Sequence, residues 1–161
     1  MEQAQIEKNA KFLVENLPGT KIKGSVRFRV KYKDLVNVAK CYGITDPKYV
    51  GSEDEIVAFP AFANAFTVKT LYSLIPAIKL EQDGIMRMVF TNPGKTLHAS
   101  QEYEFIKDIR PGDKLTSTAS IGKVWEKNLR LFIEFFVETK NQDGDIVIKG
   151  TAIYTTAPGG Y

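Results

Sequence analysis

A helical segment with almost no charge lies in the first half of this 161-residue chain. Residues 61–75 (AFANAFTVKTLYSLI) carry Lys69 as their only charged side chain, follow Pro60 and end before Pro76. Proline is tolerated in the first turn of a helix but not in its interior, so these two prolines bound one helix. A helix that is apolar on nearly all sides is normally buried. A domain of this size encloses such a helix only when a sheet wraps around it.

The second half of the chain predicts that sheet. Segments rich in β-branched and aromatic residues predict strands at residues 85–90, 97–106, 115–125, 129–140 and 146–155. The sequences NQDG at 141–144 and RPGD at 110–113 predict tight turns between strands. Strands that follow one another through short turns form an antiparallel meander. We therefore expect an α+β fold, in which a curled antiparallel β-sheet wraps around a central buried helix.

The beginning of the chain predicts two amphipathic helices and one strand. Apolar residues recur at helical spacing within residues 1–18 and again within 35–42. Residues 25–32 (SVRFRVKY) alternate apolar and basic side chains, which is typical of a half-buried strand. Because no repeat or linker is evident, we expect a single domain over residues 1–161, with an N-terminal helical segment and a C-terminal tail at 159–161.

The composition excludes several classes of site. Twenty-two Lys and Arg face nineteen Asp and Glu, a net charge of +3 with no evident basic cluster, so we expect no nucleic-acid partner. One cysteine, Cys41, and one histidine, His98, exclude an intrachain disulfide and a metal site of several such ligands. No stretch approaches the roughly 18 apolar residues of a membrane span, and residues 1–11 carry charges. We expect a cytoplasmic protein that binds no metal and no membrane.

Three stretches of the sequence resemble one known family. The first is AKCYGITDPKY at residues 39–49, followed by AFPAF at 58–62. The second is LHASQEYEF at 97–105, which runs into IRPGD at 109–113, and the third is NQDGDIV at 141–147. In this order and spacing they resemble the MaoC-like dehydratase family, specifically its N-terminal-type hot dog domain. The resemblance implies a single hot dog fold and the hydration of enoyl thioesters or the dehydration of 3-hydroxyacyl thioesters.

The family's catalytic loop reads Gly-Asp-x-Asn-Pro-x-His, and this chain departs from it. In the family the Asp and His together activate a water for attack at the β-carbon. When Gly43 and Pro47 are aligned with the loop, Ile44 takes the place of the Asp and Tyr49 that of the His. Isoleucine cannot accept a proton, and tyrosine, with an ordinary pKa near 10, is a poor base at neutral pH. The resemblance therefore implies that the catalytic pair comes from another polypeptide.

The resemblance also implies where an acyl thioester binds. In the family its oxygen meets backbone N–H groups at the start of the central helix, which stabilise an enolate-like intermediate. We therefore expect the substrate-binding residues to be Tyr49, Phe59, Pro60, Ala61, Phe62 and Asn64. No cofactor is expected, because the thioester of coenzyme A or of an acyl carrier protein is itself the substrate.

Tyr49 and Asn64 each have a plainer interpretation. Tyr49 is also interpreted as a loop aromatic that packs on Phe59, since nothing nearby in the sequence lowers its pKa. Asn64 is a polar residue near the start of a buried helix and needs a partner, either a neighbouring backbone group or a thioester carbonyl. The aromatic residues from Phe59 to Tyr72 serve as core, and a second interpretation makes them the wall of an acyl site.

His98 is the fallback catalytic residue. Strand alternation places it on the same side as Ser100, Glu102 and Glu104. A polar side of this kind more often faces solvent or an interface than an active site. Asp108 and Asp113 bracket a turn and are interpreted as solvated turn carboxylates.

The leading hypothesis is a non-catalytic subunit of an enoyl-thioester hydratase or 3-hydroxyacyl-thioester dehydratase that helps to form the acyl-binding tunnel beside a catalytic hot dog partner. One alternative is a homodimeric acyl-thioester binding or scaffolding module associated with a thiolase-type enzyme. Another is an autonomous hot dog thioesterase or hydratase, although residues 61–75 lack the Asp or Glu that thioesterase members usually place there. Whether the chain has enzymatic activity alone stays open at this point.

Overall fold

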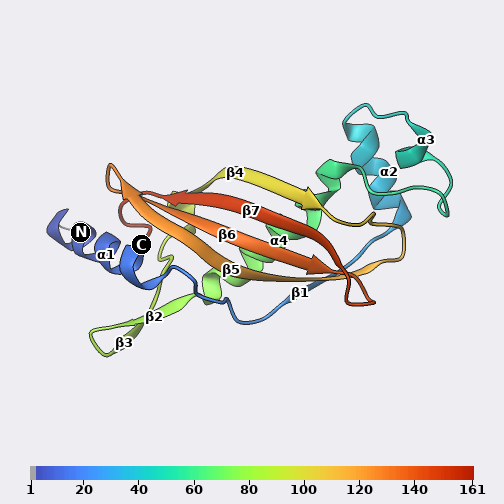
Figure 1. The fold of residues 1–161 in the computed structure, drawn as a ribbon. Coiled ribbons are helices and arrows are strands. Elements are labelled where there is room, and N and C mark those ends of the chain that lie inside the picture. The colour runs from blue at the N-terminus through green and yellow to red at the C-terminus, as the bar shows by residue number, and fades with distance from the viewer. Residues whose placement is uncertain (1–2) are drawn as a thin grey trace.

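A computed structural model describes residues 3–161, and a curved antiparallel sheet runs along its length (Figure 1). The strands of this sheet are β1 (Val26–Arg29), β4 (Thr96–Phe105), β5 (Lys114–Lys127), β6 (Arg130–Lys140) and β7 (Ile146–Thr156). Their order is β1-β5-β6-β7-β4, so β1 and β4 form the two edges. The meander is confirmed only for β5 to β7. β4 pairs with β7 rather than with β5, because the chain crosses the end of the sheet between β4 and β5.

The helix α4 (Ala63–Leu74) lies along one face of the sheet, as the apolar segment between two prolines predicted (Figure 1). The 3-10 turn η1 (Pro60–Phe62) leads into it and η2 (Ile75–Ala77) follows it. Two buried threonines of α4 remain compatible with its position because each donates to the carbonyl one turn earlier: Thr67 to Ala63 at 2.8 Å and Thr70 to Phe66 at 2.8 Å. The expected α+β architecture, a curled sheet around a central helix, is confirmed.

The core has two parts, one toward each end of α4. The helix α1 (Gln3–Asn16) packs with the C-terminal half of α4 and the middle of the sheet, through buried residues that include Leu13, Leu71 and Phe135. The helix α2 (Tyr32–Cys41) packs with the end of β1 and the N-terminal half of α4 through residues that include Leu35, Phe62 and Phe66. The short helix α3 (Pro47–Val50) follows α2. The second part of the core therefore fixes the start of α4.

One predicted strand joins a different sheet. Residues 85–90 were expected in the meander, but β3 (Ile85–Met88) pairs only with β2 (Lys79–Gln82) in a separate hairpin. Asp83 and Gly84 at its turn have φ values of 54° and 76°, the left-handed conformation that tight hairpin turns require. A final 3-10 turn, η3 (Pro93–Lys95), leads into β4.

The residues expected as a C-terminal tail lie against the fold. Tyr161 is buried, and its hydroxyl donates to the carbonyl of Leu129 at 2.8 Å. Among residues 3–161, no helix combines the length and the apolar character that crossing a membrane requires.

Candidate functional site

A cavity of about 280 Å³ opens at the start of α4. Residues from three segments line it: 48–49 in α3, 57–60 and 63 at the helix start, and 105–109 at and after the end of β4. The expected substrate-binding residues that line this cavity are Tyr49, Phe59 and Pro60. A larger hollow of about 810 Å³ lies over the sheet, where charged side chains such as Glu138 and Lys149 surround it. The smaller cavity is the candidate site, because it meets the helix start and the larger hollow does not.

The aromatic residues along α4 do not form one continuous wall. Phe62 and Phe66 contact each other inside the core, with ring centroids 6.2 Å apart. Tyr72 is 65% exposed and lines another cavity, of about 160 Å³, at the far end of α4. Among the aromatic residues from Phe59 to Tyr72, Phe59 is the one that lines the candidate site. The interpretation as core residues therefore applies to Phe62 and Phe66.

The N–H of Ala61 is a backbone donor at the start of α4. The N–H of Phe62 donates to the carbonyl of Phe59 at 2.8 Å, and that of Ala58 donates to Ile109 at 2.8 Å, which ties this segment to the chain after β4. Within residues 3–161, the N–H of Ala61 has no backbone partner. A free N–H at a helix start favours a negatively charged oxygen. Ala61 therefore supplies the kind of donor that stabilises a developing oxyanion.

Asn64 is held by a residue that the sequence interpretation did not single out. Tyr103, on β4, donates its hydroxyl proton to Asn64 Oδ1 at 2.8 Å and lies 2.6 Å from Thr67 Oγ1. Burial raises the pKa of Tyr103, although its hydrogen bond with Thr67 lowers it. The phenol is therefore neutral at pH 7 and can donate. Because the Asn64 oxygen faces Tyr103, the amide N–H groups of this exposed residue remain for a ligand.

The position of Tyr103 depends on a glycine in the neighbouring strand and on polar residues in α4. Tyr103 pairs with Gly150 of β7, and a Cβ at Gly150 would lie 3.2 Å from the tyrosine ring. Because glycine has no side chain, the Tyr103 ring can lie over β7 on the face of the sheet that α4 covers. Asn64 and Thr67, three residues apart in an apolar helix, indicated that a polar partner must lie opposite them.

The loop that aligns with the family's catalytic loop is well packed. Tyr49 meets Phe59 edge-on, with ring centroids 5.4 Å apart at 84°, in agreement with the packing interpretation. Asp46 caps α3 by accepting from the N–H of Lys48 at 2.9 Å. Ile44 is half-buried, and its N–H donates to the carbonyl of Ala39 at 3.1 Å.

His98 does not share a side with Ser100, so the expectation from simple alternation was wrong. Its partner on β7 is Tyr154, whereas Ser100 pairs with Ile153, and a β-bulge between them skips one residue. The bulge turns His98 to the face on which Tyr103 lies. There it stacks on the Tyr154 ring, with centroids 4.7 Å apart at 7°. His98 is exposed and does not line the cavity at the start of α4.

The β4 edge exposes apolar side chains and leaves polar groups unpaired nearby. Leu97 is 58% exposed and Phe105 50% exposed. Among residues 3–161, the buried side-chain atoms without a hydrogen-bond partner all belong to β4 and β7: Thr96 Oγ1, Gln101 Oε1, Tyr154 Oη, Thr155 Oγ1 and Thr156 Oγ1. Native structures leave few such groups. These atoms are buried within the chain, so the exposed apolar side chains are what mark the β4 edge as a contact surface.

Comparison with solved structures confirms the fold. The chain resembles the C-terminally truncated HadBC (3R-hydroxyacyl-ACP dehydratase) complex of Mycobacterium tuberculosis, with 16% identity, a TM-score of 0.70 and coverage of 87% of this chain and 97% of the other. A MaoC-like dehydratase from Rhodospirillum rubrum has 18% identity, a TM-score of 0.63 and coverage of 89% and 94%. The ChsH1-ChsH2 complex of Mycobacterium tuberculosis has 10% identity, a TM-score of 0.63 and coverage of 88% and 98%. This chain has the hot dog fold.

The sequence itself establishes the family. A family model described as "FAS1-like, dehydratase domain region" matches residues 16–149. The chain belongs to this family of dehydratase domains, in agreement with its resemblance to MaoC-like dehydratases. No curated protein matches the sequence.

Proposed function

We propose that this chain is the non-catalytic subunit of an enoyl-thioester hydratase or 3-hydroxyacyl-thioester dehydratase. The observation that carries the proposal is the loop at residues 43–49, where Ile44 and Tyr49 occupy the family's Asp and His positions. Isoleucine has no atom that accepts a proton, and Tyr49 packs against Phe59. The carboxylate of Asp46 is engaged by a backbone N–H of α3. None of these groups is placed as a general base.

The same end of the molecule has groups that suit a thioester. The N–H of Ala61 and the amide of Asn64 are donors that lie within one turn of each other at the start of α4. Donors fixed before the reaction stabilise an oxyanion without further reorganisation. Neither donor lines the cavity, although Ala63 between them does. The walls of the cavity include Phe59 and Ile106, which suits an acyl chain. We assign to this chain the binding of part of the acyl thioester, carried by coenzyme A or by a carrier protein.

The catalytic Asp and His would come from a second hot dog subunit that pairs with β4. Support comes from the position of β4 at the edge of the sheet and from the exposed Leu97 and Phe105. Two of the similar solved structures, HadBC and ChsH1-ChsH2, are described as complexes. An exposed strand edge with apolar side chains is a ready template for another strand.

Crotonyl-coenzyme A hydration tests the proposal. The loss of enoyl absorbance is followed with this chain alone, with a candidate hot dog partner alone, and with the two mixed. We expect activity in the mixture well above the sum of the separate rates. Full activity of this chain alone would mean that it is an autonomous hydratase. A stable homodimer that binds crotonyl-coenzyme A, gains no activity with any hot dog partner and co-purifies with a thiolase would favour the scaffolding alternative.

A further inference from the structure

A run of basic residues follows the β1 edge of the sheet. Residues 21–33 contain no acidic side chain. The basic side chains there, all exposed, are Lys21, Lys23, Arg27, Arg29, Lys31 and Lys33, which we call the basic edge. No ion pair within residues 3–161 involves any of them. The basic residues of the chain are therefore not scattered, as the weak net charge had suggested.

The fold alone does not require so much positive charge at this edge. Charged side chains within a free edge strand, such as Arg27 and Arg29 in β1, already keep it from pairing with another chain. Here Arg29 lies directly opposite Lys114 on β5, and like charges in this position are destabilising. Lys69 of α4 adds another cation beside β1, with its Nζ 5.9 Å from the centre of the Phe28 ring. This cost in stability indicates that the charge serves binding.

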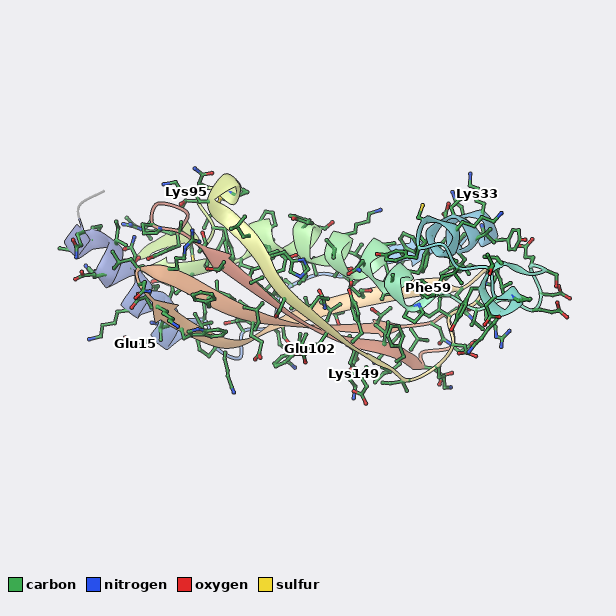
Figure 2. The ribbon with its side chains drawn as sticks, turned by 90° about the horizontal axis from the view of Figure 1, so that it is seen from above. Glu15, Lys33, Phe59, Lys95, Glu102 and Lys149 are labelled. Atoms are coloured by element: carbon green, nitrogen blue, oxygen red, sulfur yellow. The ribbon has the colours of Figure 1, made fainter. Side chains whose placement is uncertain are left out.

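The basic edge borders the part of the molecule that contains the candidate site. Val30 and Leu35, at the end of β1 and in α2, share a core cluster with Phe62 and Ala63 at the start of α4. Figure 2 shows Lys33 and Phe59 at the same end of the molecule. A partner on the basic edge would therefore stand near the cavity without covering it.

The length of the basic edge favours a macromolecule over a small anion. The four residues of β1 extend over about 13 Å at the usual rise of a strand, and the charges continue on both sides of it. A single phosphate would meet only one or two of these side chains. An acidic protein face can meet most of them together, and such complementarity raises the association rate and fixes orientation.

We propose that the basic edge docks an acidic carrier protein that delivers the acyl thioester to the cavity at the start of α4. This inference rests on the proposed function and names the carrier that the proposed function leaves open. It requires no contact between the carrier protein and β4, where the hot dog partner pairs. A thioester on free coenzyme A would reach the same cavity without using the basic edge.

The test uses the complex with its hot dog partner and compares two crotonyl substrates, one on an acidic acyl carrier protein and one on coenzyme A. The variant is Arg27→Glu/Arg29→Glu. A matched control, Lys79→Glu/Lys127→Glu, changes the net charge equally at two exposed lysines outside the basic edge. We expect the variant to raise KM for the carrier-protein substrate about tenfold and to weaken its salt dependence. The KM for crotonyl-coenzyme A should stay within about twofold in both proteins.

A second variant keeps the test decisive if the first does not fold. Lys31→Glu/Lys33→Glu lies outside β1 and should also raise KM for the carrier-protein substrate. Wild-type KM values in both variants would overturn the inference. So would an equal rise for coenzyme A, an equal rise in the control, or a preference of the basic edge for duplex DNA or anionic vesicles. If the complex hydrates neither substrate, the proposed function fails. Titration calorimetry of the carrier protein with this chain then tests separately whether the basic edge binds it.

Discussion

The two edges of the sheet differ in length, charge and completeness. The β1 edge has four residues, in which exposed Arg27 and Arg29 alternate with half-buried Val26 and Phe28. The β4 edge has ten residues, exposes Leu97 and Phe105, and lies beside the unpaired polar groups of β4 and β7. Charged side chains protect a free edge, whereas a long apolar edge invites another strand. The β1 edge is therefore closed to strand pairing, and the β4 edge is open to it.

Placing a charge on the open edge should have the largest effect. Leu97→Lys should weaken the complex with a hot dog partner about tenfold or more, because it removes apolar contact and adds a charge where the strands would meet. Ile85→Lys on the separate hairpin is the matched control, since Ile85 is 57% exposed and Leu97 58%. Sedimentation equilibrium of the mixtures measures both. Equal weakening by the two variants would contradict a specific role for β4.

The link between α4 and the open edge is tested at Asn64. Asn64→Ala removes the amide donor, and we expect KM for crotonyl-coenzyme A to rise about fivefold, the value of one hydrogen bond of about 1 kcal/mol. Tyr103→Phe should produce a smaller rise, because it leaves the amide in place but releases its oxygen. Steady-state kinetics of the complex give both values. Unchanged KM in both variants would remove Asn64 from the binding site.

Tyr154 tests the unpaired polar groups of β4 and β7. Its buried hydroxyl has no hydrogen-bond partner among residues 3–161, so Tyr154→Phe should raise the free energy of unfolding at pH 7 by about 1 kcal/mol. Burial, with smaller contributions from Tyr72 and Tyr103, raises the pKa of Tyr154 to about 12, against about 10 in the unfolded chain. The phenol ionises near pH 10 in the unfolded chain but only near pH 12 in the folded chain, so the free energy of unfolding falls as the pH rises from about 10 to about 12.

Urea unfolding at pH 7 and pH 10.5 measures both effects. The wild type should lose more stability between these two pH values than Tyr154→Phe does. Tyr72→Phe is the control, because Tyr72 is largely exposed and its loss should change stability little. A loss of stability in Tyr154→Phe at pH 7 would show that the hydroxyl has a partner in solution.

The smallest expected effect lies on the closed edge. Arg29→Glu should raise the free energy of unfolding by about 0.5 kcal/mol, because it replaces a like-charge pair with Lys114 by an opposite-charge pair. Arg27→Glu is the control, since Arg27 faces the uncharged Thr116 and should give no comparable gain. Thermal unfolding at low salt measures both. Equal gains at the two positions would show that general charge, and not the pair with Lys114, sets the stability.

Local patterns predicted the central helix and most of the strands. The two prolines and the single charge of residues 61–75 define α4, and alternation with turn residues defines β5, β6 and β7. The position of β4 beside β7 depends on which strands meet across the sheet, which sequence spacing does not contain. The hairpin of β2 and β3 required the positive φ values at Asp83 and Gly84.

The candidate site was predicted only where residues close in sequence form it. Tyr49, Phe59 and Pro60 line one cavity, and the other three expected substrate-binding residues, Ala61, Phe62 and Asn64, do not line it. The contact of Tyr103 with Asn64 joins residues 39 positions apart, and the bulge that turns His98 depends on the pairing of β4 with β7. Such contacts follow from the tertiary fold, so the local sequence indicated the polar residues but not their partners.

The measurement that tests the central claim most directly compares catalytic substitutions in the two subunits of the complex. The rate of crotonyl-coenzyme A hydration is followed with the His of the partner's Gly-Asp-x-Asn-Pro-x-His loop replaced by Ala, and separately with Tyr49→Phe and His98→Ala in this chain. We expect the substitution in the partner to lower kcat about 100-fold or more, and the substitutions in this chain to change it less than about threefold. A loss of comparable size from Tyr49→Phe or His98→Ala would place catalysis in this chain and contradict its role as the binding subunit.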